Sequence, residues 1–207
     1  MQVLLTGSIL VLDELRRVYG VQAAVLPVVE NEMLRDRRVA HLFRKSLGNR
    51  RVVVLTDEDV VSHFVASGHT ATSARAIVSG ANATGDEYFQ KVDMGEAYTL
   101  AFGVELGFPV LSHDFAARRT LRDSGLPRPD QTLRLFDLLV FGLQVGCHDV
   151  PFCDRARQTL LREDEYVPPE FMKASFGVGM TAFPASLVDG AKATVGPVAN
   201  RPLVLRQ

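Results

Sequence analysis

Short apolar runs alternate along the chain with longer segments in which apolar residues recur every three to four positions. The short runs predict buried strands at Val3–Leu5, Val52–Leu55 and Pro109–Ser112. The longer segments predict helices at 9–16, 27–45, 57–65, 95–104, 115–123, 132–144 and 154–163, with a shorter one in the Ala/Ser/Gly-rich stretch 70–84. Because strands that alternate with helices favour right-handed crossovers, this order predicts an α/β fold. We expect a three-layer α/β/α sandwich with a mostly parallel central sheet.

The composition changes at Pro168. Beyond this residue, prolines and glycines are too frequent for long helices. Phe171, Phe176 and Phe183 nevertheless make the segment too apolar for a solvated tail. We therefore expect a domain of residues 1–167 and a C-terminal arm of residues 168–207. The arm would pack on the domain or on a second copy of the chain, which would make the protein a homodimer.

The charge of the chain is nearly balanced. The 207 residues include 23 Lys+Arg and 24 Asp+Glu, and 47% are hydrophobic. This composition provides a sizeable core and excludes wholesale disorder and a strongly basic nucleic-acid-binding coat. Phenylalanines fall mainly at core spacing, so we expect no base-stacking platform. Local basic clusters can contact phosphates or form solvated faces with interspersed acids: 35–38, Arg44-Lys45, Arg50-Arg51, and Arg118-Arg119 with Arg122.

The two cysteines and the start of the chain bear on the compartment. Cys147 and Cys153 cannot form a disulfide framework, and with His148 they lack the second ligand pair of a structural zinc site. We interpret them as reduced thiols. The apolar start carries no basic region or cleavage site and is interrupted by Asp13 and Glu14, which excludes a signal peptide and a membrane span. A cytoplasmic protein without membrane contact is expected.

Acidic residues fall where the strands of the predicted sheet end. Asp114 directly follows the strand at 109–112, and Glu96 lies in the first turn of the preceding helix. Glu32, on the helix that begins at Pro27, can point to the same edge of the sheet. Clustered carboxylates repel one another unless a cation joins them, and Mg²⁺ or Mn²⁺ prefers such oxygen ligands. This pattern predicts a metal site that hydrolyses phosphodiesters. The alternative is that Asp114 caps its helix and Glu96 complements a helix dipole.

Several segments resemble motifs of the PIN-domain family, the fold of many VapC-type toxin ribonucleases. Asp93-Met94-Gly95-Glu96-Ala97, followed by 109–114 and Ala117-Arg118, resembles its third and fourth acidic motifs. Gly125-Leu126 and 132–136 resemble its closing strand and helix. The stretch 27–33 resembles the segment with the second acid, which best matches Glu32, with Glu30 as the fallback in a register shifted by two. The resemblance covers roughly residues 1–165.

The resemblance implies a Mg²⁺- or Mn²⁺-dependent endoribonuclease, such as the toxin of a toxin–antitoxin pair. Its metal-binding and catalytic residues would be Glu32, Glu96 and Asp114. RNA would be the substrate, and an antitoxin or another protein would be the partner.

One position departs from the family pattern, because Thr6 stands where the first strand usually ends in Asp. Threonine is a poor metal ligand, and Asp13 lies two turns away. Either the site works with three acids, or the chain is a catalytically degenerate module that binds RNA or a protein. A receiver-like or flavodoxin-like binding domain is a third reading, but it lacks a clear phosphate or flavin loop.

Overall fold

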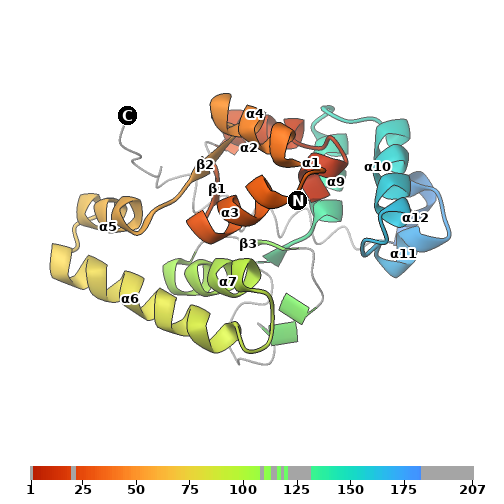
Figure 1. Ribbon diagram of the computed structural model, residues 1–207. Coiled ribbons are helices and arrows are strands. Elements are labelled where there is room, and N and C mark those ends of the chain that lie inside the picture. Colours follow the sequence, from red (N-terminus) through yellow and green to blue (C-terminus); the bar gives the residue numbers. More distant parts are fainter. Residues whose placement is uncertain are drawn as a thin grey trace.

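Helices dominate this chain. The computed structural model describes residues 2–19, 22–107, 110–112, 116–117, 119–120 and 132–182, of which 68% are helical and 6% lie in strands (Figure 1). The predicted three-layer α/β/α sandwich is therefore wrong. In the described residues, the strands form two separate two-stranded sheets and no central sheet.

Both sheets are parallel and short. β1 (Ala23–Val25) pairs with β2 (Val52–Val54), with Ala23 opposite Val52. β3 (Val110–Leu111) pairs with β4 (Thr132–Leu133). The strands predicted at 52–55 and 109–112 thus correspond to β2 and β3, whereas β1 was not predicted.

The strand predicted at Val3–Leu5 is helical instead, in α1 (Gln2–Leu5). Gly7, with a φ of 72°, follows this single turn, and its N–H donates to the Leu4 carbonyl. Val3 and Leu4 pack against buried hydrophobic clusters. A three-residue apolar run cannot distinguish a buried strand from a buried helical turn, which explains the wrong prediction.

The remaining labelled helices follow the predicted order, with some differences. The first residues of the predicted helix 132–144 form β4 instead, and the predicted helix 115–123 lies mostly outside the described residues. The predicted helix 27–45 is two helices, because the Asp36 carboxylate accepts a hydrogen bond from the Arg38 backbone N–H and stabilises a turn between them. The stretch expected to hold a short helix forms the 18-residue α6. The bounds are α2 (Leu10–Tyr19), α3 (Pro27–Arg35), α4 (Ala40–Gly48), α5 (Asp57–Ala66), α6 (Ala71–Tyr88), α7 (Met94–Leu106), α9 (Leu135–Gln144), α10 (Val150–Arg162), α11 (Pro169–Met172) and α12 (Phe176–Ala182).

Local signals set one end of α5 and one end of α7. Thr56 caps α5 in a reciprocal capping box with Asp59. Gly107 ends α7 in the left-handed conformation, with a φ of 69°. α6 and α7 lie side by side (Figure 1). Gly85 of α6 permits their close approach, because a Cβ there would lie 2.8 Å from the Tyr98 ring.

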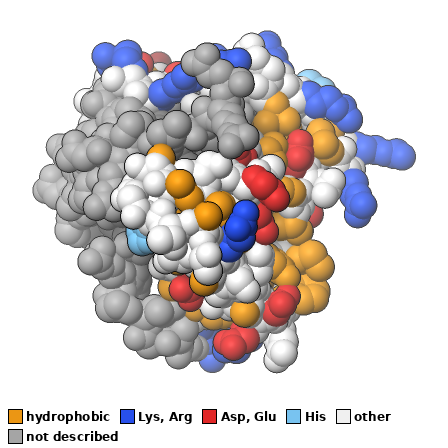
Figure 2. All heavy atoms as spheres, turned by 90° about the vertical axis from the view of Figure 1, so that its left-hand side faces the viewer, with side chains coloured by type: hydrophobic (Ala, Val, Ile, Leu, Met, Phe, Trp, Pro, Cys, Tyr) orange, Lys and Arg blue, Asp and Glu red, His pale blue; other side chains and the backbone are white. Residues whose placement is uncertain are grey.

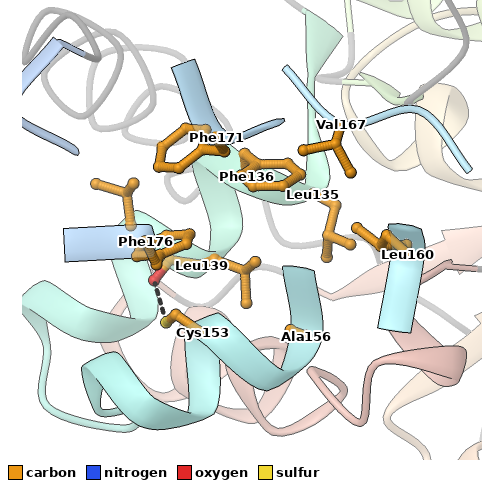
Figure 3. Close-up of a cluster of buried hydrophobic side chains, with 10 residues drawn as sticks. Leu135, Phe136, Leu139, Cys153, Ala156, Leu160, Val167, Phe171 and Phe176 are labelled. Atoms are coloured by element: carbon orange, nitrogen blue, oxygen red, sulfur yellow. Dashed lines mark hydrogen bonds between the residues drawn. The ribbon is translucent and has the colours of Figure 1, made fainter. Parts of the chain in front are cut away.

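α9 is shared by two of the hydrophobic clusters. Eight consecutive residues, from Leu135 to Gly142, are buried. One side of α9 packs with α10, α11 and α12 in the cluster of Figure 3, where the ring centroids of Phe136 and Phe171 are 4.7 Å apart and those of Phe171 and Phe176 are 4.9 Å apart. The other side packs against α2 and α4.

The first part of the predicted arm belongs to this core. Phe171 and Phe176 are fully buried, and the Asp154 carboxylate of α10 accepts a hydrogen bond from the Phe176 N–H at 2.7 Å. Arg157 donates to the Phe171 carbonyl at 3.2 Å. Residues 169–182 therefore pack on the body of the molecule. The rest of the arm, including Phe183, lies outside the described residues.

Candidate functional site

Glu32 projects from α3 toward the start of α7. Met33 and Leu34 of α3 face a hydrophobic cluster, whereas Glu32 is exposed. Its carboxylate Oε1 accepts a hydrogen bond from the Gly95 backbone N–H at 3.2 Å. This contact joins two segments that are 63 residues apart in the sequence. It places the Glu32 carboxylate against the residue that precedes Glu96.

Gly95 provides the space for this contact. It is buried at the start of α7, and a Cβ at this position would lie 2.4 Å from Glu32 Oε2. Thr99 Oγ1 donates to the Gly95 carbonyl at 2.6 Å and fixes the same residue from the next turn of the helix. Any larger residue at position 95 would therefore displace the Glu32 carboxylate from the first turn of α7.

Glu96 points toward the end of β3. The Ser112 hydroxyl donates to Glu96 Oε1 at 3.3 Å. Ser112 is 8% exposed, and its backbone N–H donates to the Leu133 carbonyl of β4 at 3.0 Å. Glu96 is therefore tied to the β3–β4 sheet, at the point where the chain continues toward Asp114.

Among the other positions considered from the sequence, Asp114, two positions beyond Ser112, lies outside the described residues. Glu30 lies two residues before Glu32, about 200° around α3, and so projects from the opposite side of the helix. Asp13 is paired with Arg51, whose Nε lies 2.8 Å from its carboxylate. The Thr6 hydroxyl hydrogen-bonds to the Ser8 hydroxyl at 2.7 Å.

In the described residues, Glu32 contacts Gly95, the residue before Glu96. These residues do not include all three predicted metal ligands. No group of three or more carboxylate, imidazole or thiol side chains suited to a metal ion occurs among them. The third predicted acid, Asp114, is outside that part of the chain. The metal-ligand role of the three acids stays a prediction.

A cavity of about 330 Å³ lies between the two sheets, behind this site. Its lining is almost entirely apolar and comes from both sheets. Its lining residues include Met33, Thr99 and Leu111, which are close in sequence to the site. Among the described residues, no charged side chain lines the cavity.

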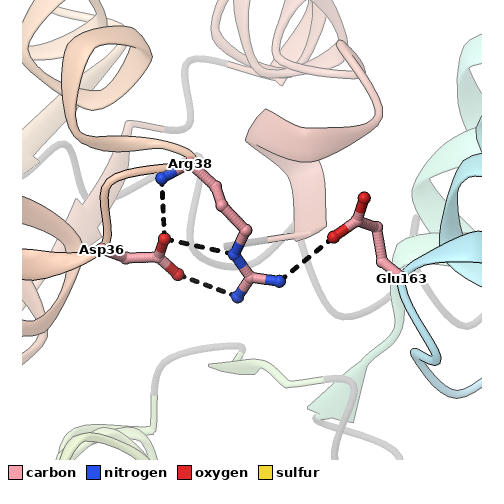
Figure 4. Close-up of polar contacts among 3 residues, drawn as sticks. All are labelled: Asp36, Arg38 and Glu163. Carbon is pink, nitrogen blue, oxygen red and sulfur yellow. Dashed lines mark hydrogen bonds and ion pairs between the residues drawn. The ribbon is translucent and has the colours of Figure 1, made fainter.

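Several of the basic residues considered as phosphate contacts are neutralised. Arg38 forms a bidentate pair with Asp36 and also reaches Glu163 at 3.2 Å, which links the α3–α4 turn to the end of α10 (Figure 4). The hydrogen bonds from Arg38 lower the pKa of Asp36. On the face shown in Figure 2, basic and acidic side chains are interspersed. This favours a solvated surface there over a continuous basic patch.

Arg35 and Arg37 differ from Arg38. Both are exposed, and neither forms an ion pair within the described ranges. Arg35 lies on α3 one turn beyond Glu32, so the two residues are neighbours on the helix surface. Arg35 is therefore an exposed basic residue beside Glu32.

Burial disfavours the charged forms of the two cysteines and of His148. Cys153 lies in the core, and burial raises its pKa to about 12. Burial also raises the pKa of Cys147 and lowers that of His148. His148 is buried and stacks on Phe152, with ring centroids 4.3 Å apart. Cys153 and His148 therefore make the contacts of core residues.

The chain matches no protein-family model, no curated protein and no solved structure. The resemblance to PIN domains thus rests on the motifs quoted above, and the fold that it implies is corrected by the structure. None of the helices in the described ranges is long and apolar enough to cross a membrane.

Proposed function

We propose that the chain is a divalent-metal-dependent endoribonuclease in which Glu32, Glu96 and Asp114 hold Mg²⁺ or Mn²⁺. One observation carries the proposal: the Glu32 carboxylate rests on the N–H of Gly95, the residue before Glu96. Glu96 in turn bonds to Ser112, two residues before Asp114. Contacts among α3, the first turn of α7 and the end of β3 thus support a site at these acids.

The chemistry of these groups fits a hard cation. Carboxylate and hydroxyl oxygens are the donors that Mg²⁺ and Mn²⁺ prefer. Like-charged carboxylates repel one another, and the attraction of each carboxylate to a bound cation offsets that repulsion. When bound, the ion would activate water and neutralise charge that develops on the scissile phosphate.

The chain's own groups would orient the acids and the substrate. The Gly95 N–H holds the Glu32 carboxylate, and the Ser112 hydroxyl holds that of Glu96. Such partners fix the direction of a metal-binding carboxylate. The exposed guanidinium of Arg35 would contact a phosphate of the RNA next to the cleaved bond.

Removal of single acids tests the proposal. We expect the wild-type protein to cleave a 5′-labelled single-stranded RNA only when Mn²⁺ or Mg²⁺ is present. Glu96→Gln and Asp114→Asn should lower the cleavage rate by about 100-fold or more, because each removes a ligand charge. Glu30→Gln is the matched control and should cleave as the wild type does. Cleavage in the presence of EDTA, or equal cleavage by all four proteins, would contradict the proposal.

The second candidate is a degenerate module that binds RNA or a protein without cleavage. It is favoured by Thr6, whose neutral hydroxyl bonds to Ser8 where the family pattern has an acid. Thr6→Asp separates the two candidates. If the parent binds the RNA without cleaving it and Thr6→Asp gains metal-dependent cleavage, the natural protein is the degenerate module. The antitoxin-like partner and the homodimer stay predictions.

A further inference from the structure

We propose that Gly95 is a positioning residue that sets where the Glu32 carboxylate lies, and with it the affinity of the site for a divalent cation. The inference rests on the proposed function, because it concerns the same metal site. It adds a residue that carries no ligand atom in its side chain. Its role is to leave space at the first turn of α7.

The first argument is steric. A Cβ on residue 95 would lie 2.4 Å from Glu32 Oε2 and 2.9 Å from both Oε1 and Cδ. Contacts this short do not persist, so an alanine would push the Glu32 carboxylate away from the helix. Gly95 itself has little freedom to retreat, because it is buried and its carbonyl accepts the Thr99 hydroxyl at 2.6 Å.

The second argument is electrostatic. The Gly95 N–H belongs to the first turn of α7, where free backbone N–H groups attract anions. Its hydrogen bond to Glu32 Oε1 holds the carboxylate in one place without a positively charged side chain. An arginine or lysine in that role would compete with a cation for the carboxylate charge. A backbone N–H orients the carboxylate and leaves its charge for the metal.

The third argument compares Gly95 with another helical glycine. Gly80 of α6 has no atom within 4 Å of the position of a Cβ. Replacement of Gly80 by alanine also adds a Cβ to a helix but displaces nothing. The pair of substitutions separates the effect on Glu32 from the general effect of alanine on a helix.

Mn²⁺ binding, measured by electron paramagnetic resonance or calorimetry, tests the proposal without any assay of activity. We expect Gly95→Ala to weaken Mn²⁺ binding by about 10-fold or more, in the range of other substitutions that disturb the orientation of a ligand. Gly80→Ala should bind Mn²⁺ as the wild type does. In a Glu32→Ala background, Gly95→Ala should cause no further loss, because the side chain that it displaces is gone.

A second measurement leaves residue 95 unchanged. In the wild type, addition of diamagnetic Mg²⁺ should shift the Gly95 amide resonance in NMR spectra, because its acceptor becomes a metal ligand. In Glu32→Ala the shift should be absent. This measurement still tests the proposal if Gly95→Ala fails to fold.

The outcomes separate this inference from the proposed function. Wild-type affinity in Gly95→Ala, further loss in the Glu32→Ala background, or an unmoved Gly95 resonance in a protein that binds Mg²⁺ would overturn the role of Gly95 alone. Absence of Mn²⁺ binding by the wild type would overturn both proposals. Normal Mn²⁺ binding without RNA cleavage would overturn the nuclease and leave the role of Gly95 standing.

Discussion

Single side chains decide how the helices of this protein meet. Tyr98 of α7 is an example, since its ring fills the space beside Gly85 and its hydroxyl donates a hydrogen bond to Asp86 on α6. The two contacts reach consecutive residues of α6, Gly85 and Asp86. One aromatic side chain therefore provides both the packing and the polar link between the two helices.

The Tyr98–Asp86 hydrogen bond predicts a pH dependence. It raises the pKa of Tyr98 above its ordinary value of about 10. Because the folded-state pKa lies above the unfolded value, the stabilisation is complete below the unfolded pKa. It is lost as the pH rises through the folded-state pKa. Asp86→Asn should lower the pKa of Tyr98 toward 10 in an NMR titration of labelled tyrosines. Glu87→Gln, the adjacent control, should leave it unchanged; equal values in both variants would contradict the prediction.

At the scale of elements, the sequence predicts what short-range chemistry determines. The Thr56 cap of α5 and the Gly107 end of α7 depend on adjacent residues, and helices were predicted at 57–65 and 95–104, within or close to the bounds of α5 and α7. The helical turn at Val3–Leu5 and the strand β1 depend on which distant surfaces these residues cover. The contact of Glu32 with Gly95 also depends on tertiary packing. The motifs indicated which acids to compare, but not that a missing side chain at residue 95 makes room for one of them.

The packing of α6 on α7 provides a matched pair of predictions. Gly85→Ala would place a Cβ 2.8 Å from the Tyr98 ring, whereas the same change at Gly80 meets open space. We expect Gly85→Ala to lower the free energy of unfolding by about 1–3 kcal/mol relative to Gly80→Ala, as overpacked sites do. Denaturant unfolding of the two variants measures the difference. Equal stability would show that α6 and α7 separate without cost.

At the scale of the whole molecule, side-chain packing and hydrogen bonds hold residues 169–182 against the body. Phe171 and Phe176 pack against Phe136 of α9. Asp154 and Arg157 of α10 form hydrogen bonds with the backbone of the same segment. The predicted boundary thus directly follows Val167, which is itself a member of the buried cluster. The division into two parts stays a prediction.

Truncation after Val167 tests that division. Removal of Phe171 and Phe176 would expose the Phe136 face of α9, and each buried phenylalanine accounts for about 3–5 kcal/mol when it is cut back to alanine. We expect the truncated chain to lose its cooperative thermal transition in circular dichroism. Phe171→Ala in the full-length chain should lower the midpoint without abolishing the transition. A truncated chain that melts like the full-length protein would show that residues 1–167 are an independent domain.

α9 has a further consequence for folding. Its residues Leu135 and Phe136 serve one hydrophobic cluster, while Leu138 and Phe141 serve the other. A helix shared in this way couples the two clusters thermodynamically, since neither can open without exposing part of the surface that α9 buries in the other. The amides of α9 should thus exchange with solvent only through global unfolding, whichever end of the chain begins to fray.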